Sequence, residues 1–250
     1  LYFRDTSPDF VIYETGLGGR LDTTNVITPI LTLITRIDYD HQDLLGPTLT
    51  DIATEKAGII KPNCPVITIS TQPTEALTVL EATSKAQAAP LKVAQPLSLP
   101  SSFAMQGAFQ EENIAIADEA ISNLFSELNL SFNDKGFDRA IHPGRFEMLS
   151  PHPIIVDCAH NPNAISALIT SLKKTPPFAS KPTLLIGMLK RKDTEQMLTL
   201  LQDYFSEIYL CDFDPGNSLS ITDINATIAD TITPISLDKV SVLLKKSSPL

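Results

Sequence analysis

The chain has 250 residues, is 43% hydrophobic and carries a formal net charge of −10, so it can bury a sizeable core in one or two domains. This acidic balance excludes a nucleic-acid footprint, which needs clustered Lys and Arg, and no apolar run approaches the roughly 18 residues of a membrane-spanning helix. The three cysteines are isolated and indicate neither a zinc site nor a disulfide framework, so we expect a reducing, cytoplasmic setting.

Short apolar runs alternate with helix-like stretches along the whole chain. This alternation is typical of an α/β fold with a mostly parallel sheet. Residues 126–144 are polar and broken by Asn, Asp, Gly and Pro, which places a domain boundary there and gives domains 1–143 and 144–250. Strands are predicted near residues 10–14, 30–35, 65–70, 145–149, 154–157, 183–188 and 207–211, and helices near residues 49–57, 74–87, 109–127, 163–174, 194–204 and 221–230.

Two of the predicted strands end beside polar side chains. Glu14 closes the run FVIYE, and Asp38, Asp40 and His41 follow the run ILTLIT. Because ligands bind at the carboxyl ends of parallel strands, we expect these two strand ends to face one cleft. A carboxylate and an imidazole suit a Mg²⁺ or Mn²⁺ ion that bridges substrate phosphates, although an isolated histidine is more often structural.

Lys56 lies near the end of the helix predicted over residues 49–57. Thr48 and Asp51 form a capping-box variant at the start of this helix, and Gly58 is the expected C-cap. Taken alone, a lysine at this place is a solvated side chain that interacts favourably with the helix dipole. Its position therefore predicts no chemical role by itself.

Three polar stretches carry a family resemblance: ETGLGGRLDTTN, DYDHQDLLGPT and IATEKAGIIKP. They resemble the folylpolyglutamate synthase/dihydrofolate synthase family of the Mur ligase superfamily, whose members are ATP-dependent amide-forming enzymes. The resemblance implies that Glu14 and His41 are metal ligands, that His41 takes part in catalysis, and that Lys56 carries a catalytic carbamate. A carbamate makes chemical sense only for a lysine whose neutral amine is accessible, as in a desolvated site.

The resemblance continues in FQEEN, HPGRFE and IIVDCAHNP, which look like nucleotide-contacting segments. Each of these residues could separately be a surface amide, a surface ion pair or a structural hydrogen-bonding group. The residues of the last segment fit this resemblance, because Asn161 and Pro162 predict a helix start with Asn as N-cap. The implied contacts are Asn113, Arg145, Asp157, His160 and Asn161 for ATP, and Leu21, Asp22 and Thr23 for the pterin or folate.

The fold implied by the resemblance is part of a P-loop-type ATPase domain followed by a smaller Rossmann-like C-terminal domain. The implied reaction activates a carboxylate of dihydropteroate or of a folate as an acyl phosphate and joins it to L-glutamate, in folate biosynthesis. Mg²⁺ is the implied cofactor, and a monovalent cation is a further candidate. The expected partners are ATP, L-glutamate and these pterins or folates, without nucleic acid or membrane, and the expected oligomeric state is a monomer.

The chain departs from the family pattern because it has no G-x-x-x-x-G-K-[ST] phosphate loop, which the family carries upstream of the position of Glu14. It opens on Leu1-Tyr2-Phe3, which reads as the end of a helix, and its end KKSSPL stops before the closing strand usual in the family. We therefore expect a fragment, and ATP hydrolysis or ligation by the 250-residue chain alone should be at background.

Three other functions compete with this interpretation. A nicotinamide oxidoreductase would need glycine in place of Leu21 to complete G-x-G-x-x-G after the first strand, so the spacing fails. Another Mur-type ligase, acting on a cell-wall precursor, would share His41 and Lys56 but not the GLGGRLDTTN run. A non-catalytic homologue that binds nucleotide is compatible with the missing phosphate loop.

Overall fold

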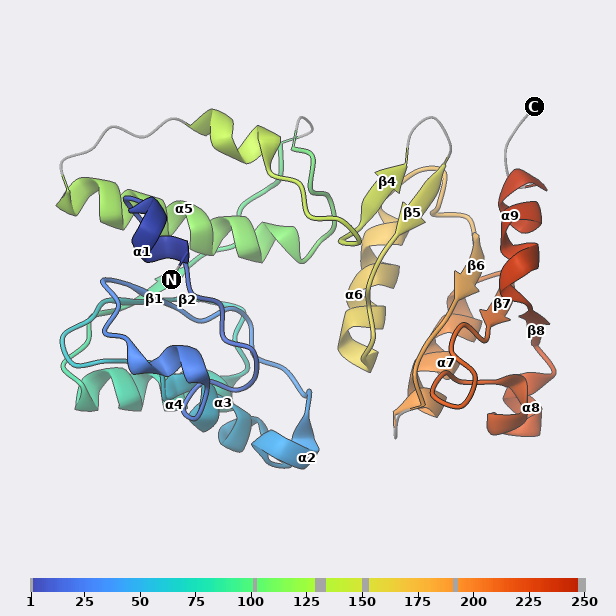
Figure 1. Ribbon diagram of the computed structural model, residues 1–250, viewed down its shortest axis with the longest axis horizontal. Coiled ribbons are helices and arrows are strands. Elements are labelled where there is room, and N and C mark those ends of the chain that lie inside the picture. Colours follow the sequence, from blue (N-terminus) through green and yellow to red (C-terminus); the bar gives the residue numbers. More distant parts are fainter. Residues whose placement is uncertain (1, 101–102, 129–133, 150–152, 191–192, 247–250) are drawn as a thin grey trace. The chain divides into compact units, whose positions relative to one another are not determined.

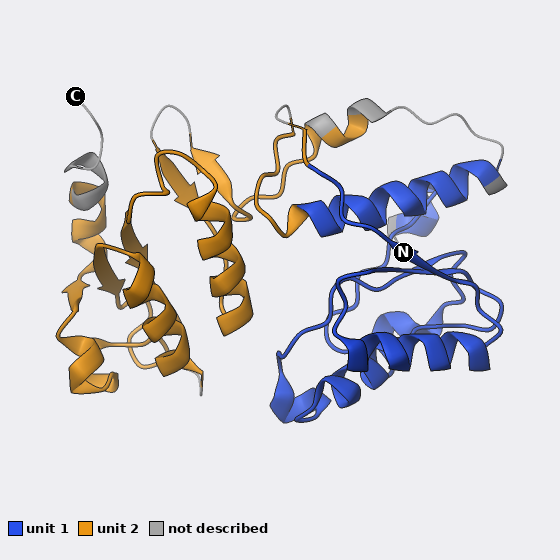
Figure 2. Cartoon of the chain, turned by 180° about the vertical axis from the view of Figure 1, so that it is seen from behind, with its two compact units in different colours: residues 1–98, 111–133 blue, residues 99–110, 134–250 orange. Residues whose placement is uncertain are grey.

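The computed structural model describes residues 2–100, 103–128, 134–149, 153–190 and 193–246 (Figure 1). The chain forms two compact units, here called unit 1 and unit 2 (Figure 2). Unit 1 comprises residues 1–98 and 111–133, and unit 2 comprises residues 99–110 and 134–250. The domain boundary after residue 143 stays a prediction.

Unit 1 is built on a parallel sheet with the strand order β1-β2-β3. The strands are β1 (Thr32–Leu33), β2 (Val66–Ile69) and β3 (Leu91–Ala94). All four residues of β2 are buried, which is expected of a central parallel strand that is covered on both faces.

Helices cover both faces of this sheet (Figure 1). Helices α3 (Leu49–Ala57) and α4 (Thr74–Ala86) pack against each other and share a core with Val66. Helix α5 (Gln110–Glu127) contributes Ala115, Ile116 and Ala120 to a second core with Ile67 and Ile69. Successive residues of a strand point to opposite faces, so β2 separates the two cores.

Unit 2 contains an antiparallel pair and a parallel three-stranded sheet in the order β6-β7-β8. Its strands and principal helices are β4 (Glu147–Leu149), β5 (Ile154–Val156), α6 (Pro162–Lys173), β6 (Thr183–Ile186), α7 (Thr194–Tyr204), β7 (Glu207–Cys211) and β8 (Ile232–Ile235). Helices α6 and α7 pack together, and both contribute to one large apolar core that also contains Phe146 and Phe178. A helix between consecutive parallel strands is the usual crossover connection of an α/β fold.

The remaining elements complete the described chain. They are α1 (Tyr2–Thr6), α2 (Gln42–Leu45), α8 (Ala226–Ala229), α9 (Leu237–Lys246) and the 3-10 helices Thr23–Val26, Asp134–Arg139 and Ile221–Asp223. Within the part of the chain that is described, no helix has both the length and the apolar character needed to cross a bilayer.

The predicted α/β class with parallel sheets is confirmed. Helices α3 and α7 have the predicted bounds, and the predicted capping box of α3 is present, with the Thr48 side chain accepting from the Asp51 amide and the Asp51 side chain accepting from the Thr48 amide. Asn161 caps α6 as predicted, and Pro162 occupies its first turn.

The predicted strand over residues 10–14 is wrong, because these residues form neither helix nor strand. Ile12 is 92% exposed and Tyr13 is 49% exposed, so the run is not the buried strand that its apolar residues indicated. A short apolar run becomes a strand only when a neighbouring strand satisfies its backbone groups, and residue pattern alone does not supply that neighbour. Glu14 is therefore not the end of a strand.

The predicted helix over residues 221–230 is wrong as a single element. Ser220 caps the 3-10 helix Ile221–Asp223, and Asn225 caps the separate helix α8. Asparagine and serine side chains bond to nearby backbone amides, so a second cap inside a run favours two short helices over one. The strands β3 and β8 and the helices α2 and α9 were not predicted.

Candidate ligand-binding segments

The glycine-rich loop of unit 1 is folded around Asp22. One carboxylate oxygen of Asp22 accepts hydrogen bonds from the amides of Gly16 (2.8 Å) and Leu17 (3.1 Å), and the other accepts from the amide (2.9 Å) and hydroxyl (2.6 Å) of Thr24. The hydrogen bond from the Thr24 hydroxyl is the largest of the causes that lower the pKa of Asp22 to about 2. The carboxylate therefore holds the loop closed and caps the 3-10 helix that follows.

This lowered pKa predicts an acid-sensitive loop. Because the pKa falls from 3.8 to about 2 on folding, the Asp22 carboxylate stabilises the folded state above about pH 4 and loses this effect as the pH falls to about 2. We expect Asp22→Asn to lower the free energy of unfolding near neutral pH, with the difference from wild type shrinking between about pH 4 and pH 2. Urea unfolding across this range checks it, and a difference that does not change with pH would contradict it.

The same loop lies against the C-terminal end of α3. A Cβ atom on Gly19 would lie 2.9 Å from the Glu55 carbonyl oxygen, and one on Gly58 would lie 2.6 Å from the Cα of Arg20. The Arg20 amide donates to the Glu55 carbonyl (2.8 Å), and the Arg20 guanidinium pairs with the Glu55 carboxylate at 2.8 Å. Two glycines thus permit backbone contact between motifs about 35 residues apart.

Asn25 closes this contact. Its side-chain amide donates to the carbonyl oxygens of Arg20 and Gly58, both at 3.0 Å, and the Lys61 ammonium donates to the Asn25 carbonyl oxygen at 2.9 Å. Sequence reasoning did not single out Asn25, Arg20 or Glu55, although Asn25 ends the GLGGRLDTTN run. These side chains tie the loop to the helix end that carries Lys56.

Lys56 occupies the last turn of α3 and is half-buried. Desolvation lowers the pKa of its ammonium below 10.5, and the negative charge of Asp40 opposes this shift. Burial of an amine favours its neutral form, which is the form that reacts with carbon dioxide.

His41 has a left-handed backbone conformation, with φ 50°, and precedes α2. Its amide donates to the Asp40 carboxylate at 2.9 Å, and its Nε2 lies 3.8 Å from the same oxygen atom. Glu14 is exposed and follows no strand. Leu21 is 78% exposed and Thr23 is exposed at the start of its 3-10 helix.

The donor chemistry of Glu14, His41 and a carbamylated Lys56 suits Mg²⁺, which takes carboxylate oxygens and retains waters. In the residues described here, however, no three His, Cys, Asp or Glu side chains gather in a way that could hold a metal ion. The predicted metal site of Glu14, His41 and Lys56 stays a prediction.

In unit 2 the segments HPGRFE and IIVDCAHNP come together through β4 and β5. Asp157 accepts hydrogen bonds from the amides of Phe146 and Ala159, both at 2.8 Å, and the Cys158 amide donates to the Gly144 carbonyl at 2.9 Å. Phe146 is buried although its φ is 49°, a left-handed conformation that is rare for a bulky side chain. The Asp157 carboxylate stabilises this turn through the Phe146 amide.

The remaining predicted nucleotide contacts of unit 2 lie on either side of this turn. The side chain of Arg145 is exposed, and its amide donates to the His142 carbonyl at 3.2 Å. His160 is exposed, with Nδ1 3.0 Å from the Cys158 carbonyl. Asn161 accepts from the Ala164 amide at 2.8 Å and so is engaged as a helix cap.

A cavity of about 770 Å³ lies beside these residues in unit 2. Asp157 and His160, which follow β5, and Gly187 and Met188, which follow β6, are among the residues that line it, together with apolar side chains of α6 and α7. Its volume is within the range of about 300–1,000 Å³ usual for small-molecule sites. The residues that follow β5 and those that follow β6 therefore line the same cavity, whose volume suits a small molecule.

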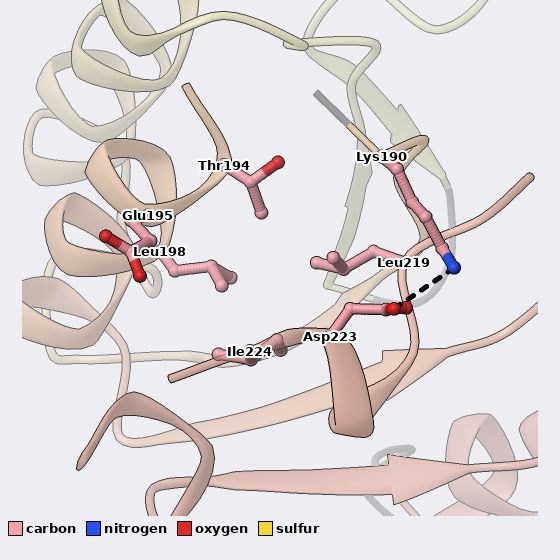
Figure 3. A pocket seen from close by; sticks show the side chains of 7 residues that line it. All are labelled: Lys190, Thr194, Glu195, Leu198, Leu219, Asp223 and Ile224. Carbon is pink, nitrogen blue, oxygen red and sulfur yellow. Dashed lines mark ion pairs between the residues drawn. The ribbon is translucent and has the colours of Figure 1, made fainter. Parts of the chain in front are cut away.

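A smaller cavity of about 260 Å³ lies by the loop after β6 (Figure 3). At its border the Lys190 ammonium pairs with the Asp223 carboxylate at 3.1 Å. Asp223 also accepts from the Ser220 hydroxyl and amide, and these bonds are the largest causes that lower its pKa to about 2. Both charges are thus engaged within the protein.

Asn113 belongs to unit 1, in the first turn of α5, and is exposed. The residue before it, Glu112, is half-buried and bonds to side chains that follow β1 and β2. The sequence did not single out Glu112, because a glutamate is common in the first turn of a helix, where its charge interacts favourably with the helix dipole.

Comparison with known proteins places these segments in a family. Residues 144–245 match the family model described as Mur ligase, glutamate ligase domain. The dihydrofolate synthase/folylpolyglutamate synthase of Bacillus subtilis is 36% identical over 251 aligned positions, which cover 88% of this chain and 58% of that protein. The chain therefore spans little more than half the length of this relative.

Solved structures agree with the sequence comparison. Mycobacterium tuberculosis folylpolyglutamate synthase complexed with ADP and AMPPCP superposes with a TM-score of 0.82 at 25% identity, covering 98% of this chain and 64% of that one. A structure described as an FPGS-AMPPCP-folate complex superposes with a TM-score of 0.77 at 27% identity, covering 98% of this chain and 67% of that one.

The resemblance stated from the motifs is confirmed. Residues 144–245, within unit 2, match the glutamate ligase domain of the Mur ligases, and the chain is similar over most of its length to folylpolyglutamate and dihydrofolate synthases.

Proposed function

We propose that the protein carrying this chain is an ATP-dependent ligase that adds L-glutamate to dihydropteroate, to the glutamate tail of a folate, or to both. The observation that carries the proposal is the docking of the GLGGRLDTTN loop on the helix end that holds Lys56. Lys56 itself is half-buried, and desolvation lowers the pKa of its amine, as the implied carbamate requires. We propose these substrates because the similar proteins are named as dihydrofolate and folylpolyglutamate synthases.

In the proposed reaction an oxygen of the acceptor carboxylate attacks the γ-phosphorus of ATP, the bond between this phosphorus and the β,γ-bridging oxygen breaks, and ADP leaves, so that the acceptor becomes an acyl phosphate. The neutral amine of L-glutamate then attacks the acyl carbon and phosphate leaves, which forms the amide. Phosphorylation is needed because the carboxylate oxygen is itself a poor leaving group. Mg²⁺, held by Glu14, His41 and carbamylated Lys56, would neutralise charge on the transferring phosphoryl group.

The remaining residues bind and orient the substrates in this proposal. Leu21, Asp22 and Thr23, on the loop that the Asp22 carboxylate holds closed, would contact the pterin or folate. Asn113 would contact the adenosine portion of ATP from unit 1. In unit 2 the nucleotide contacts would be Arg145, Asp157, His160 and Asn161, and the cavity beside Asp157 and His160 supports this assignment.

The proposed setting is a monomer in the cytoplasm. Cys64, Cys158 and Cys211 are free thiols, which suits a reducing compartment. ATP, L-glutamate and the pterin or folate acceptor are the proposed small-molecule partners, and a monovalent cation is a further candidate ligand.

Phosphate release tests this function. We expect the protein made from its complete reading frame to release phosphate from Mg-ATP only when L-glutamate and an acceptor are both present. Dihydropteroate and tetrahydrofolate, offered separately, would distinguish the two activities. Release with a cell-wall precursor instead of either acceptor would indicate another Mur-type ligase, and nucleotide binding without release would indicate a non-catalytic homologue.

A further inference from the structure

A polar network fastens the first turn of α5 to the ends of β1 and β2 within unit 1. The Thr71 hydroxyl, two residues after β2, donates to the Glu112 carboxylate at 2.6 Å. Arg36, three residues after β1, donates to the Thr71 carbonyl at 2.9 Å and lies 3.6 Å from the same Glu112 oxygen. The Glu112 carboxylate thus links the start of α5 to the residues that follow β1 and β2.

The loops that carry this network are themselves rigidly connected. The buried side chain of Gln72 accepts from the Ile37 amide at 2.8 Å and donates to the Thr35 carbonyl at 2.8 Å. These bonds join the chain after β2 to the chain after β1. Thr71 therefore presents its hydroxyl from a fixed backbone, and Glu112 binds to a preformed partner.

The Thr71 hydrogen bond outweighs the Arg36 ion pair. The Arg36 side chain is 45% exposed, and its 3.6 Å separation from Glu112 is long, so solvent screens most of this interaction. The Thr71 bond is short and charge-assisted, and the Glu112 side chain is only 19% exposed. Loss of the hydroxyl should therefore cost more than loss of the guanidinium.

We propose that Glu112 is a positioning residue for nucleotide binding, which acts by fixing the first turn of α5 to Thr71. This inference rests on the proposed function, in which Asn113, the next residue along α5, contacts ATP. Glu112 need not touch the nucleotide itself. By holding the helix start on the strand ends, it would orient the Asn113 amide before ATP arrives, so that less freedom is lost on binding.

Steady-state kinetics of the protein made from its complete reading frame test this role. We expect Glu112→Ala and Thr71→Val each to raise the KM for ATP about tenfold, the scale of one charge-assisted hydrogen bond, with kcat changed less than about twofold. Glu112→Gln keeps an acceptor for the Thr71 hydroxyl and should restore most of the affinity. Because the two single changes remove the same hydrogen bond, the KM for ATP of the double variant should be no higher than that of either single variant.

Glu119→Ala is the matched control. Glu119 lies two turns further along α5 and pairs with Lys92 of β3, and its side chain is 23% exposed, close to that of Glu112. We expect this variant to keep the wild-type KM for ATP. An equal rise in KM for Glu119→Ala, an unchanged KM for Glu112→Ala, or a fall in kcat alone would overturn the positioning role.

Amide hydrogen exchange separates failure of this inference from failure of the proposed function. Residues 110–114 should exchange faster in Glu112→Ala and Thr71→Val than in wild type or Glu119→Ala. If the wild-type protein released no phosphate with any acceptor, the proposed function would fail, and faster exchange would still support the fixing of the helix start. Unchanged exchange at residues 110–114 would overturn the inference whatever the activity.

Discussion

Lys56→Ala should lower glutamate-dependent phosphate release by about two to three orders of magnitude, the loss usual when one group that stabilises developing charge is removed. The physical reason is that Lys56 combines a helix-end position with a desolvated amine of lowered pKa. An alanine offers no nitrogen for a carbamate. The measurement is the initial rate of phosphate release by the protein made from its complete reading frame, with saturating Mg-ATP, L-glutamate and acceptor.

Two controls make this result specific. Lys85 is an exposed lysine in the last turn of α4, and Lys85→Ala should keep the wild-type rate. If a carbamate forms on Lys56, added bicarbonate should raise the rate of wild type after removal of carbon dioxide but leave Lys56→Ala unchanged. A Lys56→Ala variant that keeps more than about a tenth of the wild-type rate would remove this lysine from the chemistry.

Gly58→Ala should destabilise the protein by about 1–3 kcal/mol, the usual range for forcing extra atoms into a packed contact. Gly58, the C-cap of α3, has an ordinary right-handed conformation with φ −62°, so its backbone angles alone would admit alanine and would even favour it slightly, because alanine has less freedom in the unfolded chain. The contact reverses the sign, because the new Cβ would lie 2.6 Å from the Cα of Arg20. Backbone cannot move away as a flexible side chain can.

Urea unfolding measures this change, and Gly136→Ala is the control. No atom lies within 4 Å of a Cβ built on Gly136, so this variant should unfold within about 0.5 kcal/mol of wild type. If Gly58→Ala unfolded like Gly136→Ala, the loop of residues 16–25 would not lie against the end of α3. The docking that supports the proposed function would then be lost.

The helices were largely predictable from the sequence, because capping residues and the spacing of apolar residues along a helix are local signals. Thr48 and Asp51 mark the start of α3, and Asn161 with Pro162 marks the start of α6. Strands were less predictable, because a strand depends on its neighbours. The run at residues 10–14 looked like a strand and is exposed coil, whereas β3, in which only Ala94 is buried, was missed.

The sequence motifs named candidate site residues, but they did not predict the contacts that hold these segments together. The motif residues predicted a role for Lys56, and its lowered pKa agrees with the desolvation that a carbamate requires. The docking by Arg20, Asn25 and Gly58 depends on backbone atoms meeting across about 35 residues, and no local pattern encodes such a meeting. Asp22 was predicted to line a folate pocket, which stays a prediction, and the structure shows that its carboxylate bonds to its own loop.

The most direct test of the proposed ligase follows oxygen from the acceptor into phosphate. Dihydropteroate or tetrahydrofolate labelled with heavy oxygen in the reacting carboxylate would be incubated with Mg-ATP, L-glutamate and the protein made from its complete reading frame. The proposed acyl phosphate predicts one labelled oxygen in the released phosphate for each glutamyl residue gained by the acceptor. Glutamate addition with unlabelled phosphate would contradict the acyl-phosphate mechanism, and phosphate release without any glutamate addition would contradict the ligase itself.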